Sequence, residues 1–98
     1  MNNININGYK FEGPYDFDRN FDNTFSCIYA IVENNKLIYI GITSDINERF
    51  LDHHKEDCWR RNISHTNTLY ILREGNESVR ERIEQEIRDN FNTPCNEV

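Results

Sequence analysis

Residues 26–42 read SCIYAIVENNKLIYIGI and carry the clearest structural signal in the chain. Two runs of β-branched and aromatic residues flank Asn34-Asn35. Because Asn tolerates a positive φ, a pair of them between two such runs predicts a tight β-hairpin. Side chains alternate between the two faces of a strand, and in the first run both alternating sets are largely apolar. We therefore expect other elements to cover one face of this hairpin fully and the other in part.

Downstream of the hairpin, the pattern predicts a helix, a strand and a second helix. Asp45 and Glu48 have the spacing of a capping box and predict the start of the first helix. Residues 66–73, TNTLYILR, have the composition of a third strand. Ser78 and Glu81 form a second capping box. The helix after it carries an apolar stripe at helical spacing, made of Val79, Ile83, Ile87 and Phe91.

The N-terminal residues 1–25 differ from the domain that we assign to residues 26–98. They are rich in Asn, Asp and aromatic residues and show no sustained period of 2 or 3.6. Disordered tails normally carry fewer aromatic residues. We therefore expect an irregular N-terminal arm packed on an α+β domain, in which a small three-stranded antiparallel sheet is flanked by helices in the order β-β-α-β-α.

The composition restricts the number of domains, the mode of nucleic-acid binding and the cellular location that we expect. A chain of 98 residues has room for one core. Its net charge of −6 is unfavourable for a protein that holds nucleic acid through phosphate contacts alone. Three cysteines without a C-x-x-C pair argue against a disulfide framework and favour a reducing compartment. The sequence shows no signal peptide and no apolar stretch of about 20 residues, so we expect a cytoplasmic protein without a membrane partner.

Two tyrosines in the hairpin are candidates for chemistry. If the strands pair directly across Asn34-Asn35, Tyr29 lies opposite Ile40. Tyr29 and Tyr39 then project from opposite faces, unless a β-bulge resets the register. Taken alone, both tyrosines fit ordinary sheet packing as well as a functional role.

Three charged or titratable residues also have two interpretations. Arg49 and His53 are one helical turn apart, which suits either a solvated helix edge or a phosphate and proton-transfer site. Glu84 has Arg80 and Arg88 at i−4 and i+4. It therefore fits either a surface ion-pair ladder or a carboxylate at the core boundary that binds a divalent cation.

The order of these residues along the chain resembles the GIY-YIG nuclease superfamily over residues 26–97. The resemblance rests on Ile28-Tyr29, Tyr39-Ile40-Gly41, Arg49, His53, Glu84 and Asn96. It implies a small three-stranded sheet and hydrolysis of phosphodiester bonds with one divalent cation, Mg²⁺ or Mn²⁺. The first motif begins with Cys27 in place of the family's glycine, which removes no catalytic side chain.

By position, the resemblance also implies a role for each residue. Tyr29 matches the tyrosine proposed to activate the attacking water, and Tyr39 matches the one that orders that water and the phosphate. Arg49 matches the arginine that steadies charge on the phosphate, and His53 an active-site histidine of some members. Glu84 matches the metal ligand. The asparagine that buttresses the family's site corresponds to Asn96.

A basic, aromatic patch follows the first predicted helix and consists of Lys55, Trp59, Arg60 and Arg61. It suits contact with a phosphate backbone and stacking on a base. Equally, Trp59 could anchor the chain to the core while the arginines offset neighbouring acidic residues. A zinc site is less favoured, because its candidate ligands form no paired C-x-x-C or H-x₃-H unit. Those candidates are His53, His54, Cys58 and His65.

The interpretation that joins these observations is a single-domain endonuclease that cuts DNA or, less readily, RNA, with one bound Mg²⁺ or Mn²⁺. The alternative is a non-catalytic module of the same fold that binds nucleic acid or a protein. A domain that works inside a complex, with a protein partner supplying the targeting, would suit the acidic net charge.

Overall fold

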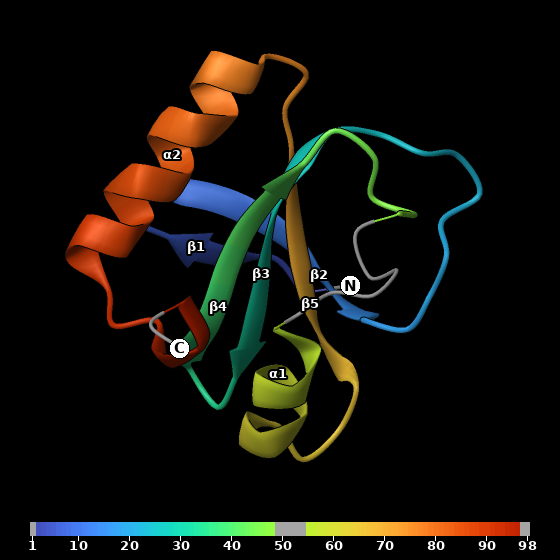
Figure 1. The fold of residues 1–98 in the computed structure, drawn as a ribbon, viewed down its shortest axis with the longest axis vertical. Helices are drawn as coiled ribbons and strands as arrows, with labels where there is room; N and C mark the ends of the chain where they lie inside the picture. Colours follow the sequence, from blue (N-terminus) through green and yellow to red (C-terminus); the bar gives the residue numbers. More distant parts are fainter. Residues whose placement is uncertain (1, 49–54, 97–98) are drawn as a thin grey trace.

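The computed structural model describes residues 2–48 and 55–96, which form a curled antiparallel sheet of five strands with two helices and a 3₁₀ turn (Figure 1). The sheet order is β1-β2-β5-β3-β4. The predicted α+β class is confirmed, but the sheet has two more strands than predicted. The elements are β1 (Ile4–Ile6), β2 (Tyr9–Asp16), β3 (Cys27–Glu33), β4 (Lys36–Thr43), α1 (Glu56–Asn62), β5 (Asn67–Arg73), α2 (Glu77–Asn90) and η1 (Pro94–Asn96).

The central hairpin forms as predicted, with Asn34 and Asn35 at φ of 53° and 62°. Its register contains a β-bulge. Val32 pairs with Leu37 but Ile31 pairs with Tyr39, so β4 has one extra residue at this point. The bulge turns every residue of β4 beyond it to the other face. Tyr29 therefore lies opposite Gly41, and the direct pairing of Tyr29 with Ile40 was wrong.

The two additional strands lie in the segment predicted to be irregular. β1 pairs with β2 across Asn7-Gly8, whose φ values are 55° and 88°. Asn-Gly is the commonest signal for a two-residue hairpin turn, and here it outweighs the weak apolar alternation of the flanking residues. β2 then pairs with β5, which places this hairpin along the edge of the sheet. Four of the aromatic side chains in the N-terminal segment are buried: Phe11, Tyr15, Phe17 and Phe21.

The helix predicted from Asp45 does not begin there. The backbone after Asp45 forms a turn at residues 46–48, and the Asp45 side chain accepts a hydrogen bond from the Asn47 N–H, a bond that an N-cap residue also makes. The helix described in this region is α1, which carries most of the basic, aromatic patch. Residues 49–54, over which this helix was expected to continue, lie outside the described residues.

The strand and helix that follow agree more closely with the sequence. β5 covers most of residues 66–73, and α2 begins with Asn76 as its N-cap. The Asn76 side chain accepts a hydrogen bond from the Val79 N–H at 3.1 Å. The capping box proposed for Ser78 and Glu81 is therefore replaced by a cap two residues earlier.

The sheet separates two hydrophobic clusters. The aliphatic cluster lies beneath α2 and consists of Ile6, Phe11, Ile28, Ala30, Leu37, Ile40, Ile83 and Ile87. The aromatic cluster lies on the opposite face. Its rings are Tyr15, Phe17, Phe21, Tyr29, Tyr39 and Trp59, packed with Cys27, Ile31, Ile38, Ile46, Cys58, Leu69, Ile71 and Cys95. Within residues 2–48 and 55–96, no helix is long and apolar enough to cross a membrane.

The cysteines do not follow the prediction. Cys58 in α1 and Cys95 in η1 form a disulfide with a Cα–Cα distance of 5.7 Å, and the buried Cys27 of β3 is not part of it. The two bonded residues are 37 positions apart and meet only because α1 and η1 both pack beside β4. Sequence spacing carries no local signal for such a pair.

Candidate active site

The bulge in β4 places the two motif tyrosines on the same face of the sheet. Tyr29 and Tyr39 are 3% and 8% exposed, and their ring centroids are 6.0 Å apart. Both rings belong to the aromatic cluster. The alternative in which a bulge resets the register is therefore the one that the structure contains.

Gly41 is opposite Tyr29 and makes room for its ring. A Cβ atom on Gly41 would lie 2.6 Å from Tyr29 Cζ and 2.9 Å from a carbon of the Tyr39 ring. These distances are shorter than carbon atoms tolerate, so any side chain here would displace the tyrosines. The glycine of the second motif is thus required for close approach rather than for an unusual backbone conformation.

Tyr39 has an electrostatic environment that favours the protonated hydroxyl. Burial raises the pKa of Tyr39, and a hydrogen bond from the Tyr29 hydroxyl partly offsets this rise. The negative charge of Glu84 raises the pKa of Tyr39 further. The α2 carboxylate and the β4 hydroxyl are therefore close enough to influence one another.

Glu84 occupies the flank of α2, next to the buried Ile83 that packs under the sheet. Burial raises the pKa of Glu84, while Arg88 lowers it and Glu81 raises it. The predicted ion-pair ladder does not form between the described residues, because Arg80 is itself buried and donates to the backbone oxygen of Glu74. Glu84 is thus a half-buried carboxylate whose charge is only partly compensated.

This environment fits a divalent cation. Mg²⁺ in proteins is usually held by one or two carboxylates, with water and substrate phosphate completing its coordination. A half-buried, partly desolvated carboxylate supplies the anionic oxygen ligand that such an ion needs. No group of three or more His, Cys, Asp or Glu side chains gathers as a metal site within the part of the chain that the structure describes.

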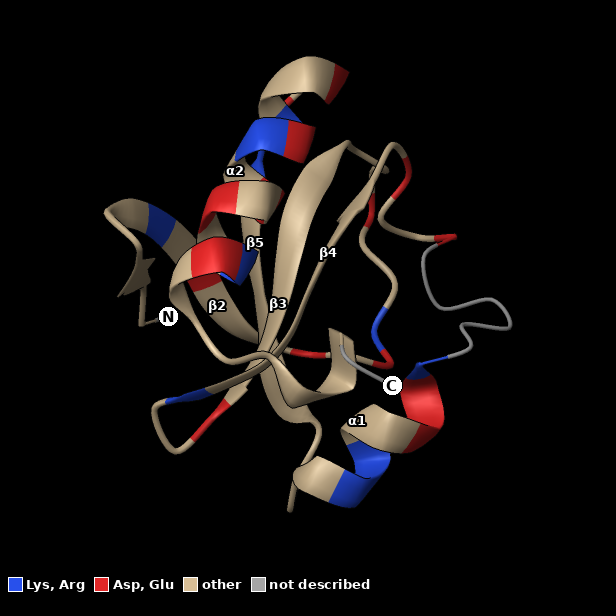
Figure 2. Cartoon of the chain, turned by 60° about the vertical axis from the view of Figure 1, so that its left-hand side comes forward, with Lys and Arg blue, Asp and Glu red and all other residues tan. Residues whose placement is uncertain are grey.

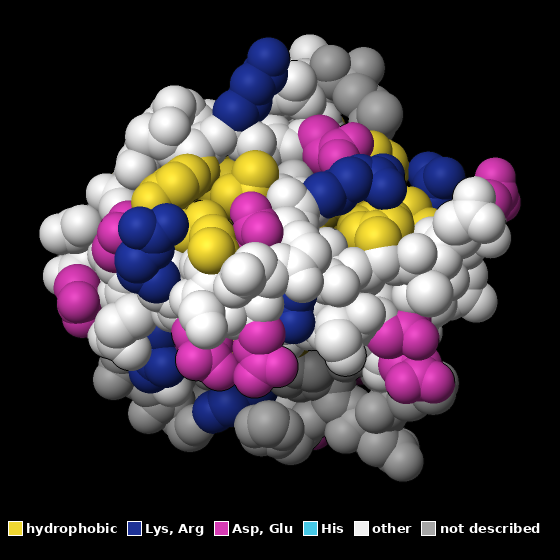
Figure 3. Space-filling view, turned by 90° about the horizontal axis from the view of Figure 1, so that it is seen from above, with side chains coloured by type: hydrophobic (Ala, Val, Ile, Leu, Met, Phe, Trp, Pro, Cys, Tyr) yellow, Lys and Arg dark blue, Asp and Glu magenta, His cyan; other side chains and the backbone are white. Residues whose placement is uncertain are grey.

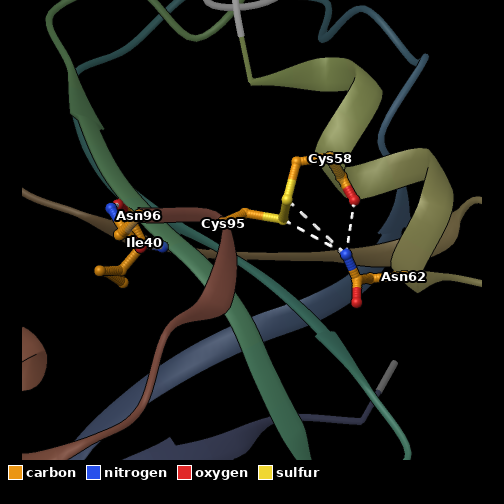
Figure 4. Close-up of a disulfide and its surroundings, with 5 residues drawn as sticks. All are labelled: Ile40, Cys58, Asn62, Cys95 and Asn96. Atoms are coloured by element: carbon orange, nitrogen blue, oxygen red, sulfur yellow. Dashed lines mark hydrogen bonds between the residues drawn. A yellow bond between two sulfur atoms is a disulfide. The ribbon is translucent and has the colours of Figure 1, made fainter. Parts of the chain in front are cut away.

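Asn96 fastens the C-terminal turn to the strand that carries Tyr39. Its side-chain oxygen accepts from the Ile40 N–H and its amide donates to the Ile40 oxygen, both at 2.9 Å (Figure 4). β4 is the last strand of the sheet, so these backbone groups have no neighbouring strand to pair with. Asn96 supplies that pairing at the residue next to Tyr39.

Trp59 is in the core, which matches the anchoring alternative for the basic patch. It is fully buried, and its ring centroid lies 5.1 Å from that of Tyr39 and 6.4 Å from that of Tyr29. A ring in this position is covered by the protein and does not present a face to a base. No sequence pattern indicated that Trp59 contacts both tyrosines.

The basic residues of the patch have different surroundings. Arg60 pairs with Glu56 at 2.9 Å and with Asp18 at 3.0 Å. Arg61 is exposed, and Lys55 is half-buried. In α1 the acidic residues occupy the first turn and the basic residues the last, whereas β3 and β4 carry charge only at their hairpin end (Figure 2).

Two predicted site residues, Arg49 and His53, lie outside the described residues. The structure does describe the segment that leads to them. Asn47 accepts from the Phe21 N–H at 2.7 Å and donates to the Phe21 oxygen at 2.9 Å. The chain before Arg49 is thus fastened to the aromatic face of the sheet. The zinc alternative loses one of its ligands, because Cys58 is in the disulfide.

Comparison with known proteins agrees with this geometry. The model of the GIY-YIG catalytic domain matches residues 25–95. Searches of the curated proteins and of the solved structures gave no match. GIY-YIG catalytic domains are nucleases that act on nucleic acid and typically use a divalent cation. The paired tyrosines, Gly41 and Glu84 all fall within the matched range, and the chain therefore belongs to the GIY-YIG family of phosphodiesterases and endonucleases.

Proposed function

We propose that this chain is an endonuclease that hydrolyses phosphodiester bonds in DNA, and less readily in RNA, with one Mg²⁺ or Mn²⁺ bound at Glu84. The observation that carries the proposal is the pairing of two buried tyrosines on one face of the sheet. Their rings lie 6.0 Å apart, and the charge of Glu84 influences the pKa of Tyr39. Two buried hydroxyls and a half-buried carboxylate are the groups that activation of water near a bound cation needs.

The two tyrosines have different roles in this proposal. Tyr39 keeps its proton at neutral pH, because burial and Glu84 both raise its pKa. It therefore orients the water and the phosphate by hydrogen bonding. Tyr29 accepts the proton of the attacking water, as the resemblance to the family implied. A tyrosine needs a nearby cation or base for this role, and His53 is the proposed helper.

Charge on the phosphate is neutralised in two ways. Arg49 is proposed to contact the phosphoryl oxygens where negative charge develops. The cation, when bound at Glu84, supplies Lewis-acid stabilisation and a template for the substrate. Asn96 holds β4 at Ile40 and so supports the position of Tyr39.

Substrate contact away from the reacting phosphate is proposed for Lys55, Arg60 and Arg61. Because Arg60 already pairs with two carboxylates, the exposed Arg61 is expected to contribute more than Arg60. On the face seen in Figure 3, basic side chains are interspersed with acidic ones. This distribution and the net charge of −6 favour a few local phosphate contacts or targeting by a protein partner over tight nonspecific binding.

The decisive experiment compares cleavage of supercoiled, linear and branched DNA and of single-stranded RNA, with Mg²⁺, Mn²⁺ or EDTA. Wild type is measured beside Glu84→Ala and Glu86→Ala. Glu86 is a matched control, because it is also a half-buried glutamate of α2 but accepts a hydrogen bond from Tyr9 at 2.8 Å. We expect metal-dependent cutting that is lost in Glu84→Ala and retained in Glu86→Ala.

Two outcomes would contradict the proposal. Cutting that survives EDTA or Glu84→Ala would remove the cation from the mechanism. Failure of folded wild type to cut any of these substrates, combined with metal-independent nucleic-acid binding, would favour the non-catalytic module.

A further inference from the structure

The tyrosine pair is held from two sides by two dipeptides that a disulfide joins. Cys58 and Trp59 are consecutive residues of α1, and Cys95 and Asn96 are consecutive residues of η1. The Cys58–Cys95 bond connects them (Figure 4). In each dipeptide the cysteine is therefore the direct neighbour of a residue that contacts the tyrosine region.

The first contact is made by Trp59. Its ring is fully buried and meets the Tyr29 ring edge-on at an interplanar angle of 81°. The angle between the Trp59 and Tyr39 rings is 57°, at a centroid distance of 5.1 Å. One indole thus packs against both tyrosines and restricts their ring positions.

The second contact is made by Asn96, which bonds both backbone groups of Ile40, the residue after Tyr39. η1 has three residues and α1 has seven. Helical segments this short have little stability of their own, so their positions depend on tertiary anchors. The disulfide is an anchor that both segments share. Asn62 lies beside it, donating to the Cys58 oxygen at 2.8 Å.

We propose that Trp59 and the Cys58–Cys95 disulfide act together as a positioning clamp for the tyrosine pair, so that the enzyme turns over faster in its oxidised form. The proposal rests on the proposed nuclease function. A dithiol reductant would break the sulfur–sulfur bond and transfer two electrons and two protons to it. The products are two cysteine thiols and the oxidised dithiol. Without the bond, α1 and η1 would hold Trp59 and Asn96 independently.

Trp59 is a positioning residue in this proposal, because it acts on the reaction only through the tyrosines. Loss of the clamp should therefore lower kcat and leave KM nearly unchanged, since no substrate contact is removed. A merely stabilising crosslink would leave the kcat of the folded enzyme unchanged. Two further signals report the clamp without any cleavage, namely fluorescence of Trp59, the one tryptophan of the chain, and hydrogen exchange at the Ile40 amide.

The experiment uses the full chain and the DNA substrate that wild type cuts best. It compares oxidised wild type, wild type reduced with dithiothreitol and checked by thiol titration, and the Cys58→Ala/Cys95→Ala double variant. Ile87→Val is the matched control, because it weakens the packing of the opposite face without touching the clamp. Trp59→Phe keeps an aromatic ring against the tyrosines, and Trp59→Leu removes it.

We expect kcat to fall about tenfold in reduced wild type and in the double variant, with KM changed less than about twofold. Dithiothreitol should have no further effect on the double variant. Trp59→Phe should recover most of the turnover that Trp59→Leu loses. Exchange of the Ile40 amide should accelerate about tenfold, and Trp59 emission should shift to longer wavelength as water reaches the indole.

The proposal is contradicted if the folded double variant and reduced wild type keep the wild-type kcat. It is also contradicted if Ile87→Val lowers kcat as much as loss of the disulfide does. Should the double variant fail to fold, reduced wild type decides the question. If wild type cuts no substrate, the proposed function fails on its own, and the two spectroscopic signals still test the clamp. Unchanged exchange and emission after reduction would then refute it.

Discussion

The two faces of the sheet bury similar numbers of strand residues but are built from different side chains. Beneath α2, the aliphatic cluster is mostly isoleucine and contains a single aromatic ring, Phe11. The opposite cluster contains six rings, a disulfide and the hydroxyls of two motif tyrosines. We propose from this contrast that the aliphatic face mainly stabilises the fold and that the aromatic face orients polar groups for catalysis.

The largest effect on stability is expected when a buried side chain of the aliphatic cluster is shortened. We expect Ile87→Ala to lower the free energy of unfolding by about 2–5 kcal/mol, because the side chain is fully buried under the sheet. Below the melting transition, the folded fraction should keep the wild-type kcat. Urea unfolding and initial cleavage rates measure the two effects. A large fall in kcat for fully folded Ile87→Ala would show that the faces are not independent.

Gly41→Ala tests the role of the aromatic face. The added methyl would lie 2.6 Å from Tyr29 Cζ, so the ring must move. We expect a loss of about 1–3 kcal/mol in stability from overpacking. In contrast to Ile87→Ala, cleavage should also fall by about 100-fold, because the hydroxyl is displaced. Gly75→Ala is the control, since a Cβ there meets no atom within 4 Å. Equal activity in both variants would contradict the role assigned to Tyr29.

The hydrogen bonds between Asn96 and the edge strand β4 are tested next. Asn96→Ala removes two hydrogen bonds to Ile40, and we expect a loss of about 1–2 kcal/mol measured by thermal unfolding. Asn90→Ala serves as the control, because its amide makes one exposed bond of 3.2 Å to Asn7. If Asn96→Ala were no more destabilising than Asn90→Ala, the edge pairing would contribute nothing to stability.

The smallest effect on stability is expected for Glu84. Its negative charge is proposed to bind the cation, but the same charge lowers stability at neutral pH. Burial raises its pKa in the folded state, so the folded protein holds a proton more tightly than the unfolded chain. Stability therefore falls as pH rises from the ordinary glutamate pKa through this raised value. Glu84→Gln removes the charge and should be slightly more stable than wild type at neutral pH without metal. Denaturation at pH 4 and pH 7 checks this, and a less stable variant at pH 7 would contradict it.

Much of the fold follows from local patterns. The hairpin across Asn34-Asn35, the strand near residues 67–73 and the apolar stripe of α2 were all predictable, because each has a repeat that its secondary structure requires. The Asn7-Gly8 hairpin was equally readable and was missed, because β1 has only three residues and Gly13-Pro14 in β2 suggested a turn. The bulge at Ile38 had no sequence signal of its own, although the motif tyrosines required one to share a face.

The roles of the candidate site residues stay predictions, and the sequence did not indicate which residues pack around them. Tyr29, Tyr39, Glu84 and Asn96 came from a resemblance of ordered motifs. The contact of Trp59 with both tyrosines depends on how α1 docks, which periodicity does not specify. The disulfide joins elements 37 residues apart and overturns the expectation of unpaired cysteines. The cytoplasmic location inferred with that expectation stays a prediction.

The measurement that tests the central claim most directly is cleavage of supercoiled DNA with Mn²⁺ by wild type and Tyr29→Phe. The substitution removes one hydroxyl from the aromatic face and leaves its ring. Our account predicts a wild type that cuts only with the cation, and a Tyr29→Phe variant that is slower by about 100-fold or more with an unchanged melting temperature. Cutting by Tyr29→Phe at the wild-type rate would contradict the assignment of the aromatic face as the catalytic one.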